Sequence, residues 1–108
     1  MASATFEDLA EETLDGLFDA IDDAIGDDVD VDFDNGILTL ELEDGRQYII
    51  NKHAASQEIW VSSPISGAAH YAYDLEAGNW ISTREGGALC TVLAAELKGL
   101  TGIEVTLT

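Results

Sequence analysis

Apolar residues recur every three or four positions through the first quarter of the chain. A side chain at this spacing falls on one side of an α-helix, so the pattern predicts an amphipathic helix over residues 5–25. Ser3 or Thr5 would cap its first turn, and Gly26 would end it in the left-handed conformation. The side predicted to face the core carries Phe6, Leu9, Thr13, Leu14, Leu17, Ile21, Ala24 and Ile25.

Strict alternation of apolar and polar residues replaces the helical period at residue 29. Residues 29–34 and 38–43 each read as a half-buried strand, and Asn35-Gly36 between them is a strong signal for a two-residue hairpin turn. Asp44-Gly45 predicts a second turn of this kind, followed by a third strand over 46–51. The Tyr48-Ile49-Ile50 run in that strand leaves open which side chains face inward.

The second half of the chain continues with short strands and a second helix. Pro64 and Gly67 end a fourth predicted strand, and Ala77-Gly78-Asn79 joins two further ones. Apolar spacing then predicts a helix that ends at Gly99. The three predicted strands cover residues 57–63, 70–75 and 80–82, and the predicted helix covers 87–98. An extended tail is predicted over 103–108.

This order of elements predicts one fold class. A chain of 108 residues is the size of a single domain, 1–108, with one core. Alternating strands joined by tight turns form an antiparallel sheet with one covered and one solvated face. We therefore expect an α+β fold, a two-layer sandwich with the N- and C-terminal helices packed on one face of the sheet.

The composition narrows the classes of function. A hydrophobic fraction of 46% argues against a disordered chain, and no apolar run approaches the roughly 20 residues that span a bilayer. The net charge of -18 disfavours nucleic acid and anionic membranes as partners, because both require clustered Lys and Arg. The single cysteine, Cys90, excludes an internal disulfide and fits a reducing compartment. The amphipathic pattern begins almost directly after Met1, so we expect no signal or transit peptide.

The negative charge is concentrated at one end of the sequence. Residues 1–34 contain 13 acidic side chains and no Lys or Arg, whereas residues 46–108 contain 6 acidic residues and all 4 basic ones. Adaptation to high salt would acidify the whole surface, so it does not explain this distribution. On the first predicted helix, one arc of about 120° carries Asp8, Glu11, Glu12, Asp15, Asp19, Asp22 and Asp23.

These seven helix acids, with the strand acids Asp30 and Asp32, are called the acidic ridge below. Like charges four residues apart on a helix repel, and aspartates at its carboxyl end oppose the helix dipole. The summed cost is about 1–3 kcal/mol, so the ridge favours a ligand: a hard cation or a basic partner. An open helix face cannot enclose a metal ion, so its binding would be weak. A solvated surface without a ligand is the alternative.

A second candidate site lies in the predicted strand 57–63. If Ile59 and Val61 point into the core, alternation places Trp60 on the outer face, where an exposed Trp indicates a binding surface. Burial of Trp60 under the following loop is the alternative. Cys90 fits the apolar pattern of the second helix and is expected in the core. His53 and His70 have no spaced partner that would suggest a metal site.

Several motifs together resemble the frataxin family, called CyaY in bacteria. The resemblance covers roughly residues 6–97 and rests on the acidic first helix, Asn35-Gly36, Asn51-Lys52, Asn79-Trp80 and, most specifically, the stretch Ile59-Trp60-Val61-Ser62-Ser63-Pro64. It implies two helices packed on an antiparallel sheet. It also implies a non-enzymatic protein that binds iron, Fe2+ or Fe3+, weakly and acts in iron–sulfur cluster assembly.

In that family the protein docks on the cysteine desulfurase–scaffold complex and modulates sulfur transfer. The resemblance assigns docking to Asn51 and Trp60. It assigns iron to seven acids of the ridge: Glu11, Asp15, Asp19, Asp22, Asp23, Asp30 and Asp32. Glu58 and His70 stand where the family commonly has a Gln and a basic residue. A bacterial, cytoplasmic origin is the preferred interpretation and a mature mitochondrial matrix form the alternative. We expect a monomer, with iron-dependent oligomers left open.

Two other classes of function use the same charge. An acidic decoy could occupy the nucleic-acid site of a basic protein, and it would not need Trp60. An enzyme that oxidises Fe(II) would need a more enclosed site than an open ridge supplies. Neither nucleophile–base pairs nor phosphate-binding glycine motifs occur in the sequence, so we expect no catalytic residues.

Overall fold

The computed structural model describes residues 6–76, 78–84 and 87–107. Two helices, α1 (Phe6–Ile25) and α2 (Leu89–Thr101), flank six strands in chain order. The strands are β1 (Asp30–Asp34), β2 (Ile37–Glu41), β3 (Gln47–His53), β4 (Glu58–Ser63), β5 (Gly67–Asp74) and β6 (Asn79–Ser82). They form one antiparallel sheet in the order β1-β2-β3-β4-β5-β6.

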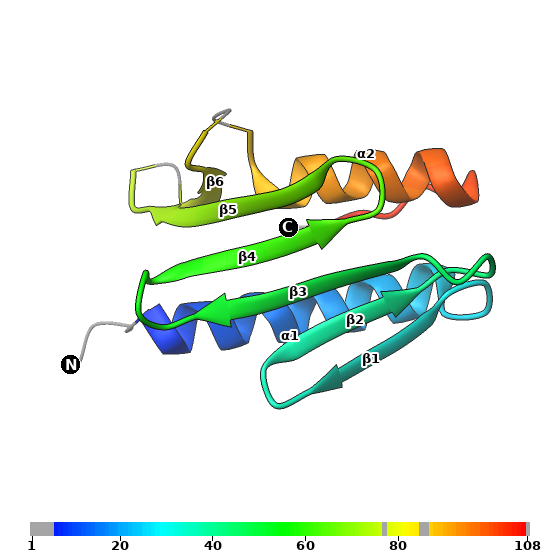
Figure 1. Ribbon diagram of the computed structural model, residues 1–108, viewed down its shortest axis with the longest axis horizontal. Helices are drawn as coiled ribbons and strands as arrows, with labels where there is room; N and C mark the ends of the chain where they lie inside the picture. The colour runs from blue at the N-terminus through cyan, green and yellow to red at the C-terminus, as the bar shows by residue number, and fades with distance from the viewer. Residues whose placement is uncertain (1–5, 77, 85–86, 108) are drawn as a thin grey trace.

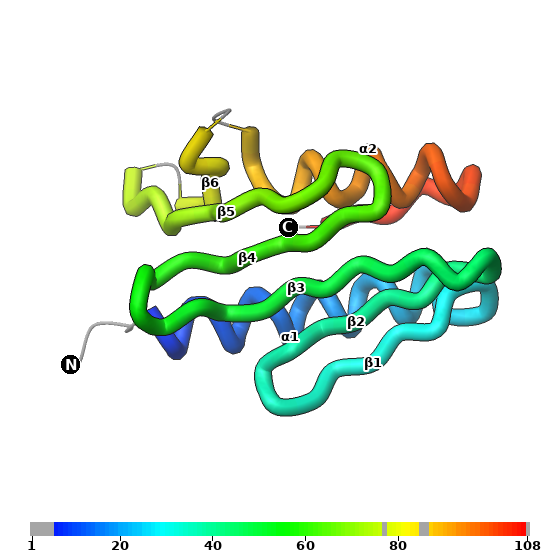
Figure 2. The backbone as a smooth tube through the Cα atoms, in the orientation of Figure 1, coloured from blue at the N-terminus to red at the C-terminus, as the bar shows by residue number. Residues whose placement is uncertain are grey.

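Both helices lie behind the same face of this sheet (Figure 1). The path in Figure 2 runs from α1 through a meander of neighbouring strands to α2, so every strand pairs with the next one in sequence. The two-layer α+β fold is therefore confirmed. Neither described helix is long and apolar enough to cross a membrane.

The core lies between the helices and the inner face of the sheet. It combines five residues of α1 with the inward positions of the strands: Ala10, Leu14, Leu17, Ile21, Ile25, Leu38, Leu40, Tyr48, Ile50, Ile59, Val61, Tyr71 and Trp80. The ambiguous run in β3 is thereby resolved, because Tyr48 and Ile50 are fully buried whereas Ile49 is exposed. Cys90 is buried on α2, as predicted, and burial raises the pKa of its thiol.

Trp80 joins the first helix to the last strand. Its ring contacts Phe6 and Tyr73 edge-on, at centroid distances of 5.9 and 5.3 Å. Its indole Nε1 donates a 2.8 Å hydrogen bond to Thr13 Oγ1, so the polar atom of this buried side chain is satisfied. These contacts fix α1 against the far edge of the sheet.

Two turn predictions differ in their outcome. Asn35 and Gly36 both have positive φ (53° and 76°), as a two-residue hairpin of the primed type requires. The second turn is longer than predicted. The Leu42 amide donates to the Arg46 carbonyl, and the three intervening residues end in Gly45 with φ 89°. A three-residue loop with a left-handed glycine closes it.

Several boundaries also differ from the predictions. Gly26 does not adopt the left-handed conformation; a Cβ there would collide with the Asp22 carbonyl oxygen, so glycine is needed for close approach. Gly99 lies inside α2, which continues to Thr101 and is capped by the left-handed Gly102. β5 begins at Gly67, because pairing with β4 extends to Ser63.

The predicted extended tail pairs with no strand over 103–107, and its alternate residues Ile103, Val105 and Leu107 face the core, with Val105 buried. The proposed caps Ser3 and Thr5 lie outside the described residues.

Candidate metal ridge and docking face

The acidic ridge lies on the solvent side of α1 and along β1, the edge strand of the sheet. All nine predicted metal residues, Asp8, Glu11, Glu12, Asp15, Asp19, Asp22, Asp23, Asp30 and Asp32, are exposed. The helix acids face away from the core because the apolar positions of α1 pack against the sheet. The rings of Phe18 on α1 and Phe33 on β1 pack with their centroids 6.0 Å apart, and this contact holds β1 beside α1. The predicted orientation of these carboxylates is therefore confirmed.

The seven helix acids of the ridge divide into two clusters. An N-terminal cluster of Asp8, Glu11, Glu12 and Asp15 borders a hollow against Phe33 and Gly36. A C-terminal cluster of Asp19, Asp22 and Asp23 lines a shallow, open depression. Asp30 belongs to neither, because it lies in a turn cluster with Asp27, Asp28, Glu41 and Glu43, and Asp32 borders none of these hollows.

The turn cluster contains carboxylates that the resemblance did not assign. Asp30 is the direct partner of Glu41 in the β1–β2 register, so two like charges face each other across the strands. A sequence signal existed, since residues 30 and 41 are symmetric about the Asn35-Gly36 turn.

No metal-enclosing group is formed by the ridge. Among residues 6–76, 78–84 and 87–107, no three carboxylate, imidazole or thiol side chains are close enough to hold an ion together. A hard cation bound here would take one or two carboxylates from the protein and its remaining ligands from water. The exposed geometry thus fits weak, exchangeable binding.

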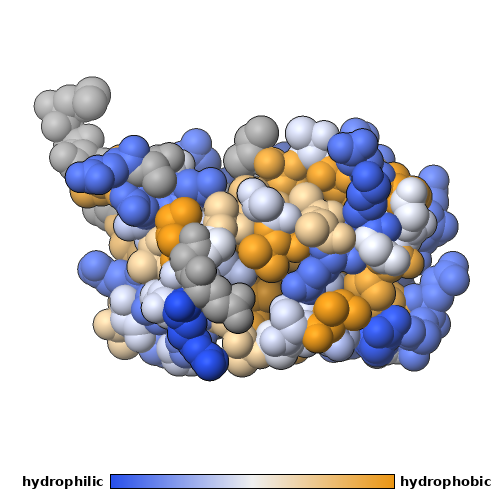
Figure 3. Space-filling view, turned by 90° about the horizontal axis from the view of Figure 1, so that it is seen from above, coloured by the Kyte–Doolittle hydropathy of each residue, from blue (hydrophilic) through white to orange (hydrophobic). Residues whose placement is uncertain are grey.

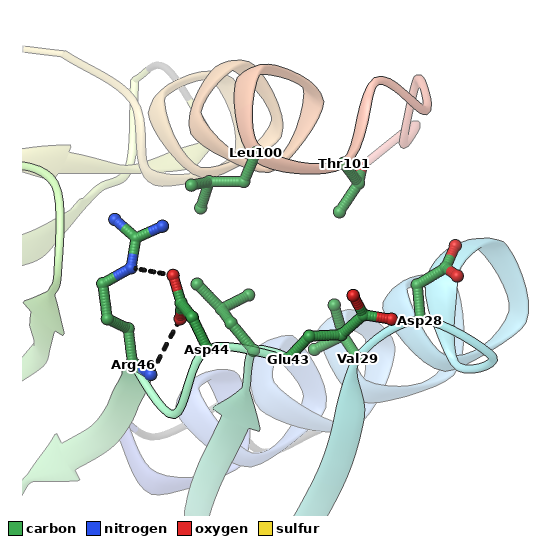
Figure 4. A pocket seen from close by; sticks show the side chains of 8 residues that line it. Asp28, Val29, Glu43, Asp44, Arg46, Leu100 and Thr101 are labelled. Carbon is green, nitrogen blue, oxygen red and sulfur yellow. Dashed lines mark hydrogen bonds and ion pairs between the residues drawn. The ribbon is translucent and has the colours of Figure 1, made fainter.

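A further hollow separates the β2–β3 turn from the end of α2, and it differs from the ridge in charge. Figure 4 shows Arg46 bonded to Asp44 on one side, with Glu43 and Asp28 on the other. Arg46 Nε lies 2.7 Å from Asp44 Oδ2, and a hydrogen bond from the Arg46 backbone amide lowers the pKa of Asp44. The guanidinium offsets the acids, so this hollow is a poor cation site.

The second predicted site lies on the outer face of the sheet. Ile59 and Val61 are buried, and Trp60 points away from them to the face opposite the helices, as predicted. Asn51 on β3 is its direct cross-strand partner. The side chain of Trp60 is half-buried, and neighbouring rings cover it rather than the Ser63-Pro64 loop.

Those rings belong to the two histidines. His53 stacks on one side of Trp60 at 3.7 Å between centroids and an interplanar angle of 7°, and His70 stacks at 4.4 Å and 11°. Trp60 Nε1 donates to Glu58 Oε1 at 2.9 Å, and the same oxygen lies 3.7 Å from His70 Nδ1. We call His53, Trp60 and His70 the histidine–tryptophan stack.

The stack holds Trp60 in one orientation in the free protein. Two parallel rings and one hydrogen bond restrict its rotation, which lowers the entropy lost on binding. Local sequence periodicity does not reveal the stack, because its three residues lie on three strands. A protonated imidazole on either face would add a cation–π contact.

The outer face of the sheet around Asn51 and Trp60, called the docking face below because docking is predicted there, also carries exposed aliphatic side chains. Ile37 and Ile49 are 43% and 41% exposed on the same side as Trp60, and Ile65 follows β4 at 52%. The edge seen from above in Figure 3 instead mixes apolar and hydrophilic side chains in small patches. The apolar residues around Trp60 therefore supply a surface suited to a protein partner.

Comparisons with known proteins place the chain in one family. The sequence profile of the Frataxin-like domain matches residues 1–103. The chain is 40% identical over 92 residues to "Frataxin homolog, mitochondrial" of Schizosaccharomyces pombe, covering 82% of this chain and 58% of that protein. It is 39% identical over 95 residues to "Iron-sulfur cluster assembly protein CyaY" of Thioalkalivibrio sulfidiphilus, covering 86% and 87%. The chain thus spans less than two thirds of the fission-yeast relative.

The fold is also similar to those of solved frataxin structures. Frataxin from Psychromonas ingrahamii superposes with a TM-score of 0.83 at 30% identity, covering 95% of this chain and 94% of that one. Trimeric frataxin from Saccharomyces cerevisiae, described as complexed with ferrous, superposes with a TM-score of 0.72 at 31% identity, covering 94% and 91%.

Proposed function

This chain belongs to the frataxin-like family, and on that premise we propose that it binds iron weakly on the acidic ridge and regulates iron–sulfur cluster assembly. In this proposal it docks on the cysteine desulfurase–scaffold complex through the face around Asn51 and Trp60. The name of the Thioalkalivibrio relative supports the pathway, and the ferrous complex of the yeast neighbour supports the metal. The protein acts as a regulator and not as an enzyme.

The observation that carries the proposal is the position of the ridge next to the docking face. Exposed carboxylates with no enclosing third ligand among the described residues suit a protein that must release iron. The preformed Trp60 surface lies on strands that are continuous with the ridge edge. One partner could therefore contact the apolar face with Trp60 and the acidic edge with its own basic side chains.

Both proposed roles draw on the same carboxylates. A basic surface of the desulfurase and an iron ion would compete for the ridge, so iron would change docking. The names of the relatives give the acidic-decoy interpretation no support. Bacterial and mitochondrial proteins both appear among the relatives, and a cytoplasmic location with a monomeric state is the proposal for this chain.

A desulfurase assay tests the proposed function. Cysteine desulfurase and scaffold proteins are assayed for sulfide release with and without this protein at several Fe(II) concentrations. We expect the rate to change with added protein and the size of the change to depend on iron. The same rate at every concentration of protein and iron would contradict the proposal.

A further inference from the structure

Lys52 places a positive charge of the protein's own on the acidic ridge. It lies on β3 opposite the buried Ile59, so its side chain leaves the sheet on the helix side. Its Nζ lies 3.1 Å from Glu11 Oε1, and this ion pair joins residues 41 positions apart in sequence. Asn51 and His53, its chain neighbours, are on the opposite, docking face.

The side chain of Lys52 is mostly enclosed, although its ion-pair partner Glu11 is exposed. Only 23% of the Lys52 side chain is exposed, against 63% for Glu11. Its stem runs along the β1–β2 turn, where the Cε atom is 3.4 Å from the position a Cβ would take at Gly36. A freely solvated surface lysine would lose more rotamer entropy in forming such a pair, so this contact is more persistent than an ordinary surface salt bridge.

Lys52 therefore already occupies the N-terminal cluster with a cation. We propose that Lys52 is a built-in competitor of the metal: it lowers the affinity of the N-terminal cluster and directs the first ion to the C-terminal cluster. This inference rests on the proposed iron binding and deepens it, because it assigns an order to the two clusters. A metal at Glu11 must displace the ammonium group or bind beside it.

Coulomb's law sets the size of the effect. In water, an ammonium group repels a divalent ion about 5 Å away strongly enough to lower the affinity of the site for that ion about tenfold. Salt screens the repulsion and reduces the effect to a few-fold. The C-terminal cluster begins at Asp19, two helical turns beyond Glu11, and it lines a separate depression. Removal of the lysine charge should therefore act on one cluster and leave the other nearly unchanged.

The test uses Mn2+, a hard, paramagnetic divalent ion that prefers oxygen ligands. Amide signals of the complete protein are followed by NMR at low ionic strength, and broadening gives an apparent Kd for each cluster. In the natural protein we expect residues 19–23 to broaden at lower Mn2+ than residues 8–15. In Lys52→Met, which keeps the apolar stem, the Kd of residues 8–15 should fall about fivefold to tenfold, and that of residues 19–23 by less than about twofold.

Two further variants serve as controls. Lys98→Met removes one positive charge from the exposed last turn of α2, so it changes the net charge equally without touching the ridge. Lys52→Arg keeps the charge and should restore the natural order of binding. A matching unfolding midpoint would show that Lys52→Met keeps the fold.

The outcomes separate this inference from the proposed function. Broadening on the ridge that is the same in the natural protein and Lys52→Met, or that shifts equally in Lys98→Met, would overturn the role of Lys52 and leave metal binding intact. Absence of broadening on the ridge in every variant would overturn the proposed function, and the inference with it.

Discussion

Replacing Trp60 with alanine is expected to weaken docking on the cysteine desulfurase–scaffold complex about 30-fold, which is about 2 kcal/mol. Trp60 is the largest side chain on the outer face, and the histidine–tryptophan stack presents it in a fixed orientation. Its removal deletes the contact area and leaves Glu58 without the indole donor. A binding titration with the purified complex would measure the loss.

The matched control for Trp60→Ala is Leu75→Ala. Leu75 is also a large apolar side chain, 85% exposed, but it follows β5 far from the stack. We expect it to leave docking unchanged. Leu75→Ala should unfold at nearly the natural midpoint. Trp60→Ala loses two ring contacts and should unfold at a slightly lower midpoint but remain folded, because Trp60 lies outside the buried core. Docking that survives Trp60→Ala but is lost when ridge carboxylates are neutralised would instead favour the acidic-decoy interpretation.

Glu96 on α2 contributes to stability because it accepts hydrogen bonds from the sheet and from the loop after β4. From α2 it accepts hydrogen bonds from Tyr48 Oη at 2.7 Å, Ser63 Oγ at 2.6 Å and, through its other oxygen, Ser66 Oγ at 2.8 Å. Burial and the adjacent Glu96 raise the pKa of Tyr48 well above its usual range, so its hydroxyl remains a donor. One carboxylate thus connects α2 to β3 and to the loop after β4.

Glu96→Ala should lower the free energy of unfolding by about 2–3 kcal/mol, because it leaves a buried tyrosine hydroxyl without its acceptor. Tyr48→Phe removes the hydroxyl itself and should cost only about 1 kcal/mol. Urea unfolding of the two variants and of the double variant would give a coupling energy of about 1 kcal/mol or more. A loss below about 0.5 kcal/mol for Glu96→Ala would show that the network contributes little.

Much of the fold could be predicted from local periodicity. The α1 pattern and the alternation around Asn35-Gly36 each depend on neighbouring residues, and both were confirmed. The errors fell at element ends. Gly99 looked like a helix stop, but a glycine within a helix costs only about 1 kcal/mol, and Leu100 beyond it packs against the core.

At the sites, too, the features set by a single element could be predicted, whereas the contacts between elements could not. The exposure of the α1 carboxylates and the outward orientation of Trp60 follow from the period of a single element, so they could be predicted. The stack of His53 and His70 on Trp60 depends on the register of three strands. The Lys52–Glu11 and Tyr48–Glu96 contacts join sheet and helix, and no local pattern shows them.

An anaerobic Fe(II) titration followed by backbone amide NMR tests most directly whether the ridge binds iron. We expect the chemical-shift changes to concentrate on residues 8–32. They should disappear when Asp19, Asp22 and Asp23 are replaced by asparagine together with Glu11→Gln and Asp15→Asn. Changes that appear elsewhere while residues 8–32 stay unmoved would contradict iron binding on the ridge.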